Sequence, residues 1–529
     1  MKILTAAQMQ RIDRITTEQC GIPSLTLMEN AGRSVVEFLA ERFAPLSSQA
    51  IAIVCGRGNN GGDGLAVARL MREQGLKPRA VLLADPTSLK GDAAQNFQRL
   101  LVTGAPEIAA ELGAWREIKK TLAGTTLLVD AILGTGLSRP VEGFLYEVIR
   151  DMNEAFSDAR IVAIDLPSGI CADSGELIGD SVLADATVTF TAPKVAHVFP
   201  PACERMGDWA VKQIGTPSKT LDDDPDLFLN LIGRDDLAWL VQSRKLDSNK
   251  GDFGRVLIVA GSTGKTGAAA LAAKAALRAG AGLVTVATAR SALPIIASLG
   301  MEYMTEPLPE TEAGTISLRA LDDRRMEKLL EGKSVMAIGP GIGSSSETAE
   351  FVRTVVNLAR IPVVLDADGL NAFDGHMNEF RAGCQSPPPA VLTPHPGEMA
   401  RLAGVTTKEI QSRRVQYARE FSNRYKVNLV LKGFRTLVAA PDGSVAVNPT
   451  GNPGMATGGT GDILTGMIAG LLAEYPARPV AEVVAGAVYL HGLAGDLAAQ
   501  DLDPASIVAG DLLGAIPKAR RALRQVHAQ

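Results

Sequence analysis

The sequence predicts an α/β protein of two domains, each a three-layer sandwich in which helices cover both faces of a sheet. Three observations carry this prediction. The chain of 529 residues is long enough for two to four domains of roughly 100–200 residues each. Short apolar runs alternate with helical patterns in both halves, which is typical of parallel sheets buried on both faces. Between the halves, residues 215–230 are polar, acidic and interrupted by prolines.

This polar stretch sets the domain boundaries. We expect the first domain to span 1–217, a linker 218–227 and the second domain 228–529. The strands expected in the first domain are 50–54, 79–84, 125–130, 160–165, 187–190 and 210–214. Those expected in the second are 255–261, 281–288, 334–341, 362–369, 390–398 and 428–433. Three helical patterns close the chain, at roughly 461–474, 480–499 and 507–524.

Composition and charge argue against several classes of protein. The formal net charge is −5, and the chain has no basic stripe of the kind that binds nucleic acid. The first residues lack a continuous apolar segment, so we expect no signal peptide, and no run of about 18 apolar residues predicts a membrane span. The five cysteines are scattered and form no C-x-x-C pair, which favours a reduced, cytoplasmic chain. Apolar helices rich in Gly and Ala permit self-association, and we expect a homo-oligomer.

The segment GRGNNGGDG at 56–64 follows an apolar strand and precedes a helical pattern. It fits G-x-G-x-x-G, a weak signal for a dinucleotide-binding loop that is also typical of a tight strand-to-helix turn. A loop for a redox cofactor needs an acidic residue about 20 residues further on, where this chain has QGLK at 74–77. Asn59, Asn60 and Asp63 still place two amides and a carboxylate at a helix N-terminus. The free backbone N–H groups of such a terminus favour an anionic ligand. We therefore predict a ligand site, but not a conventional hydride-transfer site.

Other expected strand ends carry polar side chains. Asp130 ends one strand, Asp165 and Ser168 follow another, and Lys194 follows a third. The carboxyl ends of parallel strands line the ligand crevice of an open α/β sheet, so Asn60, Asp130 and Ser168 are expected to converge there. Amide, carboxylate and hydroxyl oxygens suit a hard cation, although each residue alone is also typical of a helix cap or a turn.

Five segments of the first half together resemble the N-terminal domain of the NAD(P)H-hydrate repair enzymes, a Rossmann-like epimerase domain. They are LMENAGR (27–33), GRGNNGGDG (56–64), VDAILGTGLSRPVEG (129–143), AIDLPSG (163–169) and TAPK (191–194). The resemblance implies that the nucleotide bound here is a substrate, NADH or NADPH with a hydroxyl at C6, and not a hydride carrier. One departure is Arg57, where the family pattern has proline.

The same resemblance implies roles for individual residues. Asn60, Asp130 and Ser168 correspond to ligands of a potassium ion. Asp165 and Lys194 are the candidate catalytic residues of this domain. The residues implied in substrate binding are Asn59, Asn60, Gly61, Gly62, Asp63, Gly134, Thr135, Gly136, Leu137, Ser138, Arg139, Pro140 and Asp165.

The second half contains two glycine-rich segments. GSTGKT at 261–266 approaches a phosphate-binding P-loop, but the position that requires glycine is Val259. NPTGNPGMATGGTGD at 448–462 precedes a helix, and its backbone N–H groups favour phosphates. Asp462 starts that helix, where it is either an N-cap or a base that takes a proton from an attacking hydroxyl.

Several segments narrow the range of functions expected for this second site. GTGD at 459–462 resembles the anion hole of the ribokinase-like kinases, in which the aspartate is the base. AIGPGIG (337–343), VLDADGLN (364–371), LTPHPGE (392–398) and LKGFRT (431–436) resemble the ADP/ATP-dependent NAD(P)H-hydrate dehydratases, over roughly 235–520. The implied hydrate site is Ala268, Gly343, His395 and Asp462, and the implied nucleotide site is Lys432, Gly433, Phe434, Arg435, Thr436 and Gly461. His395 is also typical of a plain turn, and Asp366 and Asp368 are either turn residues or magnesium contacts.

The combined resemblance implies an isomerase and a lyase in one chain. The first domain would interconvert the R and S epimers of hydrated NADH or NADPH at C6. The second would transfer phosphate from ADP or ATP to the C6 hydroxyl of the S epimer, with Asp462 as base and the N–H of Gly461 as an oxyanion donor. Elimination of phosphate would restore the dihydropyridine. K+ and Mg2+ are the expected ions. The alternatives are a ribokinase-like small-molecule kinase fused to a nucleotide-binding domain, or a nucleotide-sensing regulatory protein.

Overall fold

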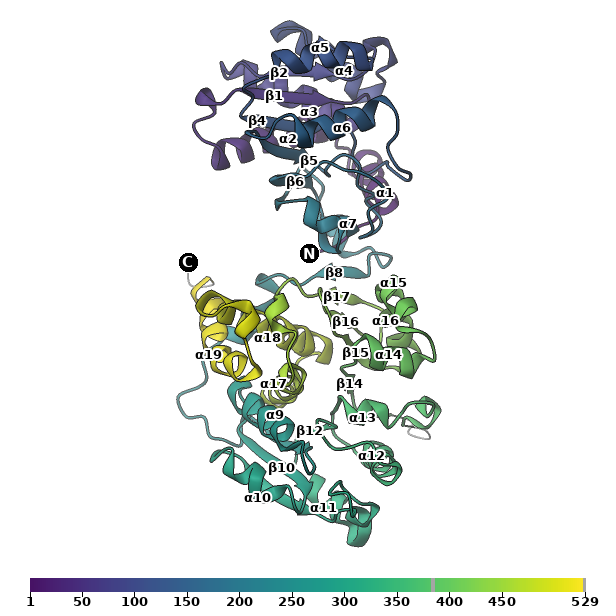
Figure 1. The fold of residues 1–529 in the computed structure, drawn as a ribbon, viewed down its shortest axis with the longest axis vertical. Helices are drawn as coiled ribbons and strands as arrows, with labels where there is room; N and C mark the ends of the chain where they lie inside the picture. Colours follow the sequence, from purple (N-terminus) through teal and green to yellow (C-terminus); the bar gives the residue numbers. More distant parts are fainter. Residues whose placement is uncertain (382–385, 527–529) are drawn as a thin grey trace. The chain divides into compact units, whose positions relative to one another are not determined.

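The computed structural model describes residues 1–381 and 386–526, and the chain divides into two compact units, Met1–Leu227 and Phe228–Gln529 (Figure 1). Each unit has its own sheet. Cys384, one of the five cysteines, lies outside the described residues.

The first unit contains a seven-stranded parallel sheet in the order β3-β2-β1-β4-β5-β6-β7. Its strands are β1 (Ile51–Cys55), β2 (Arg79–Leu82), β3 (Glu107–Ile108), β4 (Leu127–Ala131), β5 (Arg160–Ile164), β6 (Ala186–Phe190) and β7 (Asp208–Lys212). The six expected strands are confirmed within a few residues, and β3 is too short to show any periodicity. The order reverses between β1 and β4, so their carboxyl ends flank a crevice.

Helices cover both faces of this sheet, as predicted. On one face, α2 (Ser24–Arg42), α3 (Asn59–Glu73) and α4 (Gly91–Thr103) share a single apolar cluster with the strands. On the other, α5 (Leu112–Thr121) and α6 (Phe144–Glu154) pack in a separate cluster. The result is the expected three-layer sandwich.

Glycines in the 56–64 loop let α3 begin directly at the end of β1. A Cβ on Gly61 would overlap the backbone of the preceding turn. A Cβ on Gly64 would overlap the side chains of Cys55 in β1 and Ala131 in β4. The first turn of α3 is therefore held at the carboxyl ends of both strands, where its free N–H groups favour an anionic ligand.

Residues 218–227, predicted as a linker, belong to the first unit. They include α8 (Ser218–Asp222), and Leu221 and Leu227 are buried in a cluster with Leu4, Met9 and Ile12. The last two of these lie on α1 (Ala6–Glu18), whose Arg11 also pairs with Asp224 at 2.5 Å. Leu221 and Leu227 therefore dock this polar, acidic stretch onto the first unit. The average composition of the stretch gave no sign of these two contacts.

The second unit contains a ten-stranded sheet in the order β11-β10-β9-β12-β13-β14-β15-β16-β17-β8. Its strands are β8 (Leu229–Leu231), β9 (Arg255–Val259), β10 (Leu283–Ala289), β11 (Met304–Leu308), β12 (Val335–Ile338), β13 (Val363–Leu365), β14 (Ala390–Leu392), β15 (Asn428–Leu431), β16 (Leu437–Ala439) and β17 (Val445–Val447). Only β16 runs antiparallel to its neighbours. Sequence reasoning missed β8, β11, β16 and β17, which lie toward the edges of the sheet and are short.

Figure 1 shows α9, α17, α18 and α19 together on one side of this sheet and α12, α14 and α16 on the other, the layering expected of a ribokinase-like domain. These helices are α9 (Thr266–Ala279), α12 (Ser346–Leu358), α14 (Pro396–Ala403), α16 (Arg414–Tyr425), α17 (Thr460–Glu474), α18 (Val480–Asp501) and α19 (Ala509–Val526). The short helices are α7 (Val195–Val198) in the first unit and α10 (Leu293–Ser298), α11 (Arg325–Leu330), α13 (Asp368–Asn371) and α15 (Thr407–Ser412) in the second.

Small residues fix the position of α17. Gly466 and Gly470 face the backbone of α9, where a Cβ would overlap the carbonyl oxygens of Ala272 and Ala276. α17 also packs against β9, β12 and β13. Its N-terminal turn, which carries Asp462, is therefore positioned by a rigid helix–helix and helix–sheet contact.

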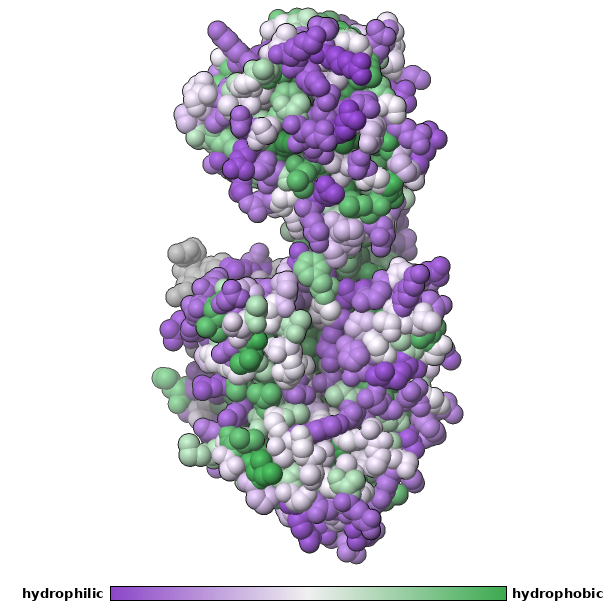
Figure 2. Space-filling model, viewed as in Figure 1, coloured by the Kyte–Doolittle hydropathy of each residue, from purple (hydrophilic) through white to green (hydrophobic). Residues whose placement is uncertain are grey.

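Among the described helices, α18 is long and apolar enough to cross a membrane. However, 67% of its most apolar stretch is buried inside the protein, as in the core helix of a soluble domain. On the face shown in Figure 2, hydrophobic residues form small, separate groups among polar residues.

The docking of residues 218–227 generates a prediction about truncation. A fragment ending at Leu227 should be more stable than one ending at 217, because the shorter fragment exposes the partners of Leu221 and Leu227. Each fully buried leucine contributes about 1.5–3 kcal/mol, so the free energy of unfolding should differ by several kcal/mol in urea titrations. As a control in the longer fragment, Asp226→Ala removes only an exposed ion pair to Arg11. This substitution should change the free energy of unfolding by about 0–1 kcal/mol. Equal stability of the two fragments would contradict the assignment of residues 218–227 to the first unit.

Candidate active sites

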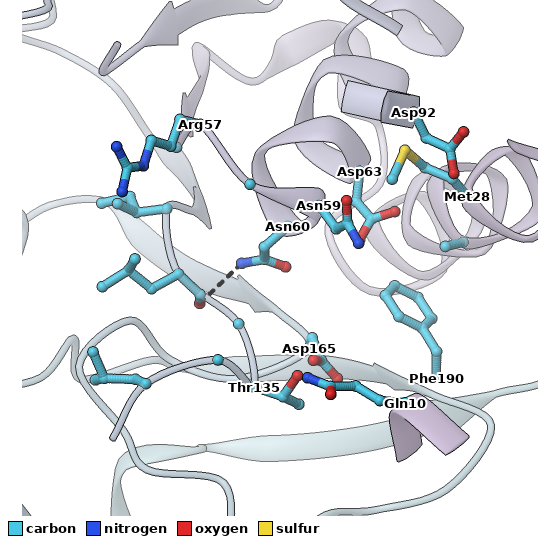
Figure 3. Close-up of a pocket in the computed structure, with 18 of the residues that line it drawn as sticks. Gln10, Met28, Arg57, Asn59, Asn60, Asp63, Asp92, Thr135, Asp165 and Phe190 are labelled. Carbon is cyan, nitrogen blue, oxygen red and sulfur yellow. Dashed lines mark hydrogen bonds between the residues drawn. The ribbon is translucent and has the colours of Figure 1, made fainter. Parts of the chain in front are cut away.

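A cavity of about 900 Å³ opens at the carboxyl ends of β1, β4 and β5 in the first unit. In Figure 3, Asn59, Asn60 and Asp63 at the start of α3 form one wall, and Thr135 and Asp165 lie on the other. The predicted residues that line the cavity are Asn59, Asn60, Asp63, Gly134, Thr135, Gly136, Leu137, Asp165 and Lys194. Three loops that are far apart in the sequence therefore meet in one site.

The remaining residues predicted to bind substrate lie outside this lining. Gly61 and Gly62 are buried in the packing of α3, where a Cβ on Gly62 would press on α2 and α4. Ser138, Arg139 and Pro140 are exposed where the loop leaves the cavity. Their contact with substrate stays a prediction.

The three predicted cation ligands meet around Leu133. Asn60 Nδ2 donates a hydrogen bond to the carbonyl oxygen of Leu133 (3.0 Å), and the Leu133 N–H donates to Ser168 Oγ (2.9 Å). Ser168 Oγ in turn donates to Asp130 Oδ1 at 2.6 Å, and the Ser168 N–H donates to Asp130 Oδ2 at 2.7 Å. Asp130 and Ser168 are fully buried.

This group of residues leaves oxygen atoms that suit a cation. Asn60 Oδ1 is buried and has no hydrogen-bond partner among the described residues. Burial raises the pKa of Asp130 to about 6 in spite of its hydrogen bonds, and a nearby positive charge would reverse that shift. An amide oxygen without a hydrogen-bond donor and a buried carboxylate fit a hard cation such as K+.

Asp165 and Lys194 form a buried ion pair beside the cavity. Lys194 is only 1% exposed, and its Nζ donates to Asp165 Oδ1 (2.6 Å), Thr189 Oγ1 (2.8 Å) and the carbonyl oxygen of Phe190 (3.3 Å). These contacts occupy all the donors of the ammonium group. Burial by itself raises the pKa of Asp165, but Lys194 outweighs it, so that pKa lies below its ordinary value. Asp165 is therefore an anion whose position Lys194 determines.

His197 orients this pair, and sequence reasoning did not identify it. Its Nδ1 accepts from the N–H of Lys194 (3.1 Å), and its Nε2 lies 3.0 Å from the carbonyl oxygen of Asp165. Burial, followed by the charge of Lys194, lowers the pKa of His197 to about 3. The imidazole is thus neutral, with its proton on Nε2. A single histidine in a short apolar segment carries no motif that could have revealed this role.

Helix α1 contributes five further lining residues that the motifs did not reveal, and Gln10 and Asp13 are two of them. Figure 3 shows Gln10 beside Thr135 and Asp165. Burial and the nearby carboxylates of Asp165 and Asp13 raise the pKa of Asp63 well above its ordinary value. The cavity therefore holds several carboxyl groups that compete for one buried cation, Lys194.

In the second unit, the loop before α17 ends at Gly459, whose φ of +94° turns the chain into the helix. Gly461 faces Lys432, since a Cβ at that glycine would lie 3.4 Å from Lys432 Nζ. The first-turn N–H groups of α17 and the ammonium of Lys432 have the charge and direction that suit a phosphate. His491 of α18 supports this turn: its Nε2 lies 2.9 Å from the carbonyl oxygen of Thr460, and burial lowers its pKa to about 4.

A buried network surrounds Asp462. Lys432 Nζ lies 2.8 Å from Asp366 Oδ1, and Thr465 Oγ1 donates to Asp366 Oδ2 at 2.7 Å. Burial by itself lowers the pKa of Lys432, but Asp366 and Glu398 outweigh it, so the amine stays charged. Burial, with repulsion from Asp366, raises the pKa of Asp462 to about 6, and Lys432 opposes this shift. Asp462 therefore has the pKa of an effective base near neutral pH.

Asp366 and Asp368, expected either as turn residues or as magnesium contacts, both bond to protein donors. Asp366 is bonded to Lys432 and Thr465, as described. Asp368 Oδ2 accepts from Lys265 Nζ at 2.9 Å and from the N–H of Gly343 at 3.0 Å. This bond holds Gly343 in place, so the predicted hydrate-site glycine lies beside the aspartate that helps to raise the pKa of Asp462.

The other predicted residues of this unit occupy the same edge of the sheet. His395 is the N-cap of α14, because its Nδ1 accepts from the N–H groups of Gly397 (3.0 Å) and Glu398 (3.4 Å), and its side chain is 52% exposed. Ala268 lies near the turn at Gly341. Residues 433–436 form the β15–β16 loop. Arg414, which no motif indicated, donates to the carbonyl oxygens of Leu431, Lys432 and Phe434 and so holds this loop.

Both units match known protein families. Residues 24–196 match the family described as YjeF-related protein N-terminus, and residues 256–518 match NAD(P)H-hydrate dehydratase. A bifunctional NAD(P)H-hydrate repair enzyme from Moorella thermoacetica is 42% identical over 99% of this chain and 98% of its own length. One from Escherichia coli is 33% identical over 97% of this chain and 93% of its own length.

Solved structures resemble the second unit. A Bacillus subtilis ADP/ATP-dependent NAD(P)H-hydrate dehydratase, co-crystallized with ATP/Mg2+, is 31% identical, with a TM-score of 0.48, over 56% of this chain and 98% of its own. A ribokinase-like superfamily protein from Enterococcus faecalis is 28% identical, with a TM-score of 0.47, over 56% and 97%. The two family matches, and whole-length relatives such as the Moorella enzyme at 42% identity, establish that this chain belongs to the bifunctional NAD(P)H-hydrate repair enzymes.

Proposed function

We propose that the chain repairs hydrated NADH and NADPH in two steps, one in each unit. The first unit epimerises the R and S forms at C6, and the second dehydrates the S form at the expense of ADP or ATP. The observation that carries this proposal is Asp462, a half-buried carboxyl with a pKa of about 6 beside the phosphate-binding turn of α17 and Lys432. A sensor that only binds nucleotides has no need of a base at that position.

In the second unit, the nucleotide phosphates lie against the first-turn N–H groups of α17 and the ammonium of Lys432. Asp462 takes the proton of the C6 hydroxyl while that oxygen attacks the terminal phosphorus, and AMP or ADP leaves. The C6–O bond then breaks with release of phosphate, because phosphate is a better leaving group than hydroxide. Loss of a proton from C5 forms the C5–C6 double bond and restores NADH or NADPH.

The residues implied in nucleotide binding fit this arrangement. Lys432, Gly433, Phe434, Arg435 and Thr436 form the loop that Arg414 holds, and Gly461 faces Lys432. Ala268, Gly343 and His395 are proposed to complete the hydrate site.

Magnesium is proposed to enter on the nucleotide. In the ranges 1–381 and 386–526, no group of three or more His, Cys, Asp or Glu side chains is arranged to hold a metal ion. Asp366 and Asp368 are already bonded to protein donors. A magnesium ion on the phosphates would offset their charge during transfer.

In the first unit, the substrate occupies the 900 Å³ cavity, with its phosphates near Asn59 to Asp63 at the start of α3. The loop from Gly134 to Pro140 borders the substrate, and the anion of Asp165 lies where positive charge develops on the ring. A potassium ion held by Asn60, Asp130 and Ser168 would order the loops around Leu133 and supply positive charge near the phosphates.

The location, oligomeric state and partners of the enzyme are also proposals. Cys20, Cys55 and Cys171 are free thiols, which supports a reduced, cytoplasmic location. We propose a homo-oligomer that acts on small molecules and does not bind nucleic acid. ADP and ATP are both compatible with the N–H groups and Lys432.

Asp462→Asn should abolish dehydration and spare nucleotide binding. We expect the rate to fall by about 10²-fold or more, because the variant keeps the shape of the phosphate site but lacks the base. In the wild-type enzyme the rate should rise with pH through about 6, since the carboxyl must be ionised to accept a proton. Recovery of nicotinamide absorbance from the S hydrate with ADP measures both effects.

Asp442→Asn is a suitable control, because this carboxylate caps the turn between β16 and β17 and should leave the rate unchanged. A normal rate in Asp462→Asn would show that Asp462 is only a helix cap. A stable phosphorylated product in place of NADH would support the kinase alternative, and binding without turnover would support the sensor.

The cation proposal predicts a specific salt effect on the first unit. Its unfolding midpoint should be higher in potassium than in lithium at equal ionic strength, because an ion that binds only the folded state stabilises it. Asp130→Asn keeps the shape of the site but removes its charge, and should abolish the difference. Thermal unfolding of the full chain, with and without hydrated NADPH, measures the effect. Identical midpoints in both salts would leave the 56–64 loop as a nucleotide site without a metal.

A further inference from the structure

Helix α1 forms a wall of the first cavity. It begins after Thr5, whose hydroxyl accepts from the N–H of Gln8 while the Gln8 side chain accepts from the N–H of Thr5. Its buried residues Met9 and Ile12 pack against the docked segment that ends at Leu227. Its lining residues are Met9, Gln10, Asp13, Arg14 and Thr17, which share one face of the helix. The helix is therefore anchored on one side and presents polar groups to the substrate on the other.

Among the lining residues of α1, Asp13 has incomplete hydrogen bonding. Its Oδ1 is buried and accepts no hydrogen bond from any residue that the structure describes. A buried acceptor without a partner has lost its hydrogen bonds to water and gained none in return. A substrate hydroxyl in the cavity would supply the missing partner.

The surrounding charges keep Asp13 and Asp165 in different protonation states. The charged groups that face Asp13 are Lys194 and Asp165, together with Asp63 of α3. Burial raises the pKa of Asp13 to about 6, Lys194 opposes the shift and Asp165 adds to it. Lys194 Nζ donates a hydrogen bond to Asp165, so Asp165 stays ionised while Asp13 holds a proton more readily. Two carboxyls whose pKa values are driven apart are typical of an acid and base pair.

The chemistry of the substrate requires such a pair. C6 of the hydrated ring carries both a hydroxyl and the ring nitrogen, so inversion requires one of these bonds to break. If the hydroxyl receives a proton, it leaves as water while the nitrogen lone pair forms a C6–N1 double bond. Water then adds to the opposite face of C6 and loses a proton. One proton is given and one is taken, with no oxidation or reduction.

We propose that Asp13 is a catalytic residue of the epimerase, an inference that rests on the function proposed for the first unit. Asp13 gives its proton to the C6 hydroxyl. Asp165 stabilises the cationic ring and takes the proton from the incoming water. Exchange with solvent returns both carboxyls to their starting states. His197, which bonds to the Lys194 N–H and the Asp165 carbonyl, is a positioning residue.

The test is R-to-S epimerisation by the full chain, measured with ADP as recovery of NADPH from the R hydrate. The rate without protein is subtracted from each measurement. Asp13→Asn should then lower kcat by about 10²-fold or more, with little change in KM, because the variant loses the acid but keeps the size of the side chain. Asp13→Glu should restore at least a tenth of the lost rate. Wild-type kcat/KM should fall as the pH rises above about 6, because the acid must be protonated, and Asp13→Asn should lack this decline.

Controls separate this inference from the proposed function. Glu18→Gln removes a charge from the exposed end of the same helix and should epimerise normally. Dehydration of the S hydrate should be unchanged in every Asp13 variant, and the first unit's unfolding midpoint shows whether it is folded. Near-normal epimerisation by folded Asp13→Asn, or no recovery in folded Asp13→Glu, would overturn the role of Asp13. Failure of the wild-type chain to epimerise at all would instead overturn the function proposed for the first unit.

Discussion

Parallel strand pairing is the constraint on which both sites depend. It places the carboxyl ends of neighbouring strands along one edge of a sheet, so loops that are distant in sequence converge there. In the first unit this edge collects the 56–64 loop, Asp130, Asp165 and Lys194. In the second it collects Asp366, Lys432 and the start of α17. Small residues then let the helices approach the strands closely enough to present their first N–H groups to a ligand.

The two sites share an electrostatic arrangement although their sheets differ in topology. Each contains a lysine that pairs with an aspartate: the buried Lys194 with Asp165, and the half-buried Lys432 with Asp366. Each also contains other carboxyls whose pKa burial raises, Asp13 and Asp63 in the first and Asp462 in the second. A lysine can compensate only a limited number of buried carboxylates, so the carboxyls without a lysine partner hold a proton more readily than the paired one.

Much of the fold could be predicted because apolar runs and glycine turns are local signals. The central strands begin within a few residues of their expected positions, and the last three helices also agree. The expected strands 362–369 and 390–398 were too long, because their last residues belong to α13 and α14. The sequence analysis missed β8, β11, β16 and β17, although the predicted strands β13 and β14 are as short as three residues. β8 and β11 are the two edge strands, and β11 is largely exposed, so it has no continuous apolar run. The packing of residues 218–227 on the first unit was missed for another reason. The segment is polar on average, and its two buried leucines, Leu221 and Leu227, contact the N-terminal helix more than 200 residues away in the chain.

The amino-acid sequence was sufficient to locate the glycine-rich turns and the strand ends that carry oxygen-bearing side chains, because glycine spacing and strand endings are properties of short segments. It was also sufficient to identify the family, through motifs that span most of both units. The protonation states of the ionisable groups depend instead on the tertiary structure. Asp13, His197, Arg414 and His491 carry no motif, and their roles arise from burial and from partners on other elements. A pKa depends on the charges and the solvent within a few ångströms, and those neighbours are set when distant segments pack together.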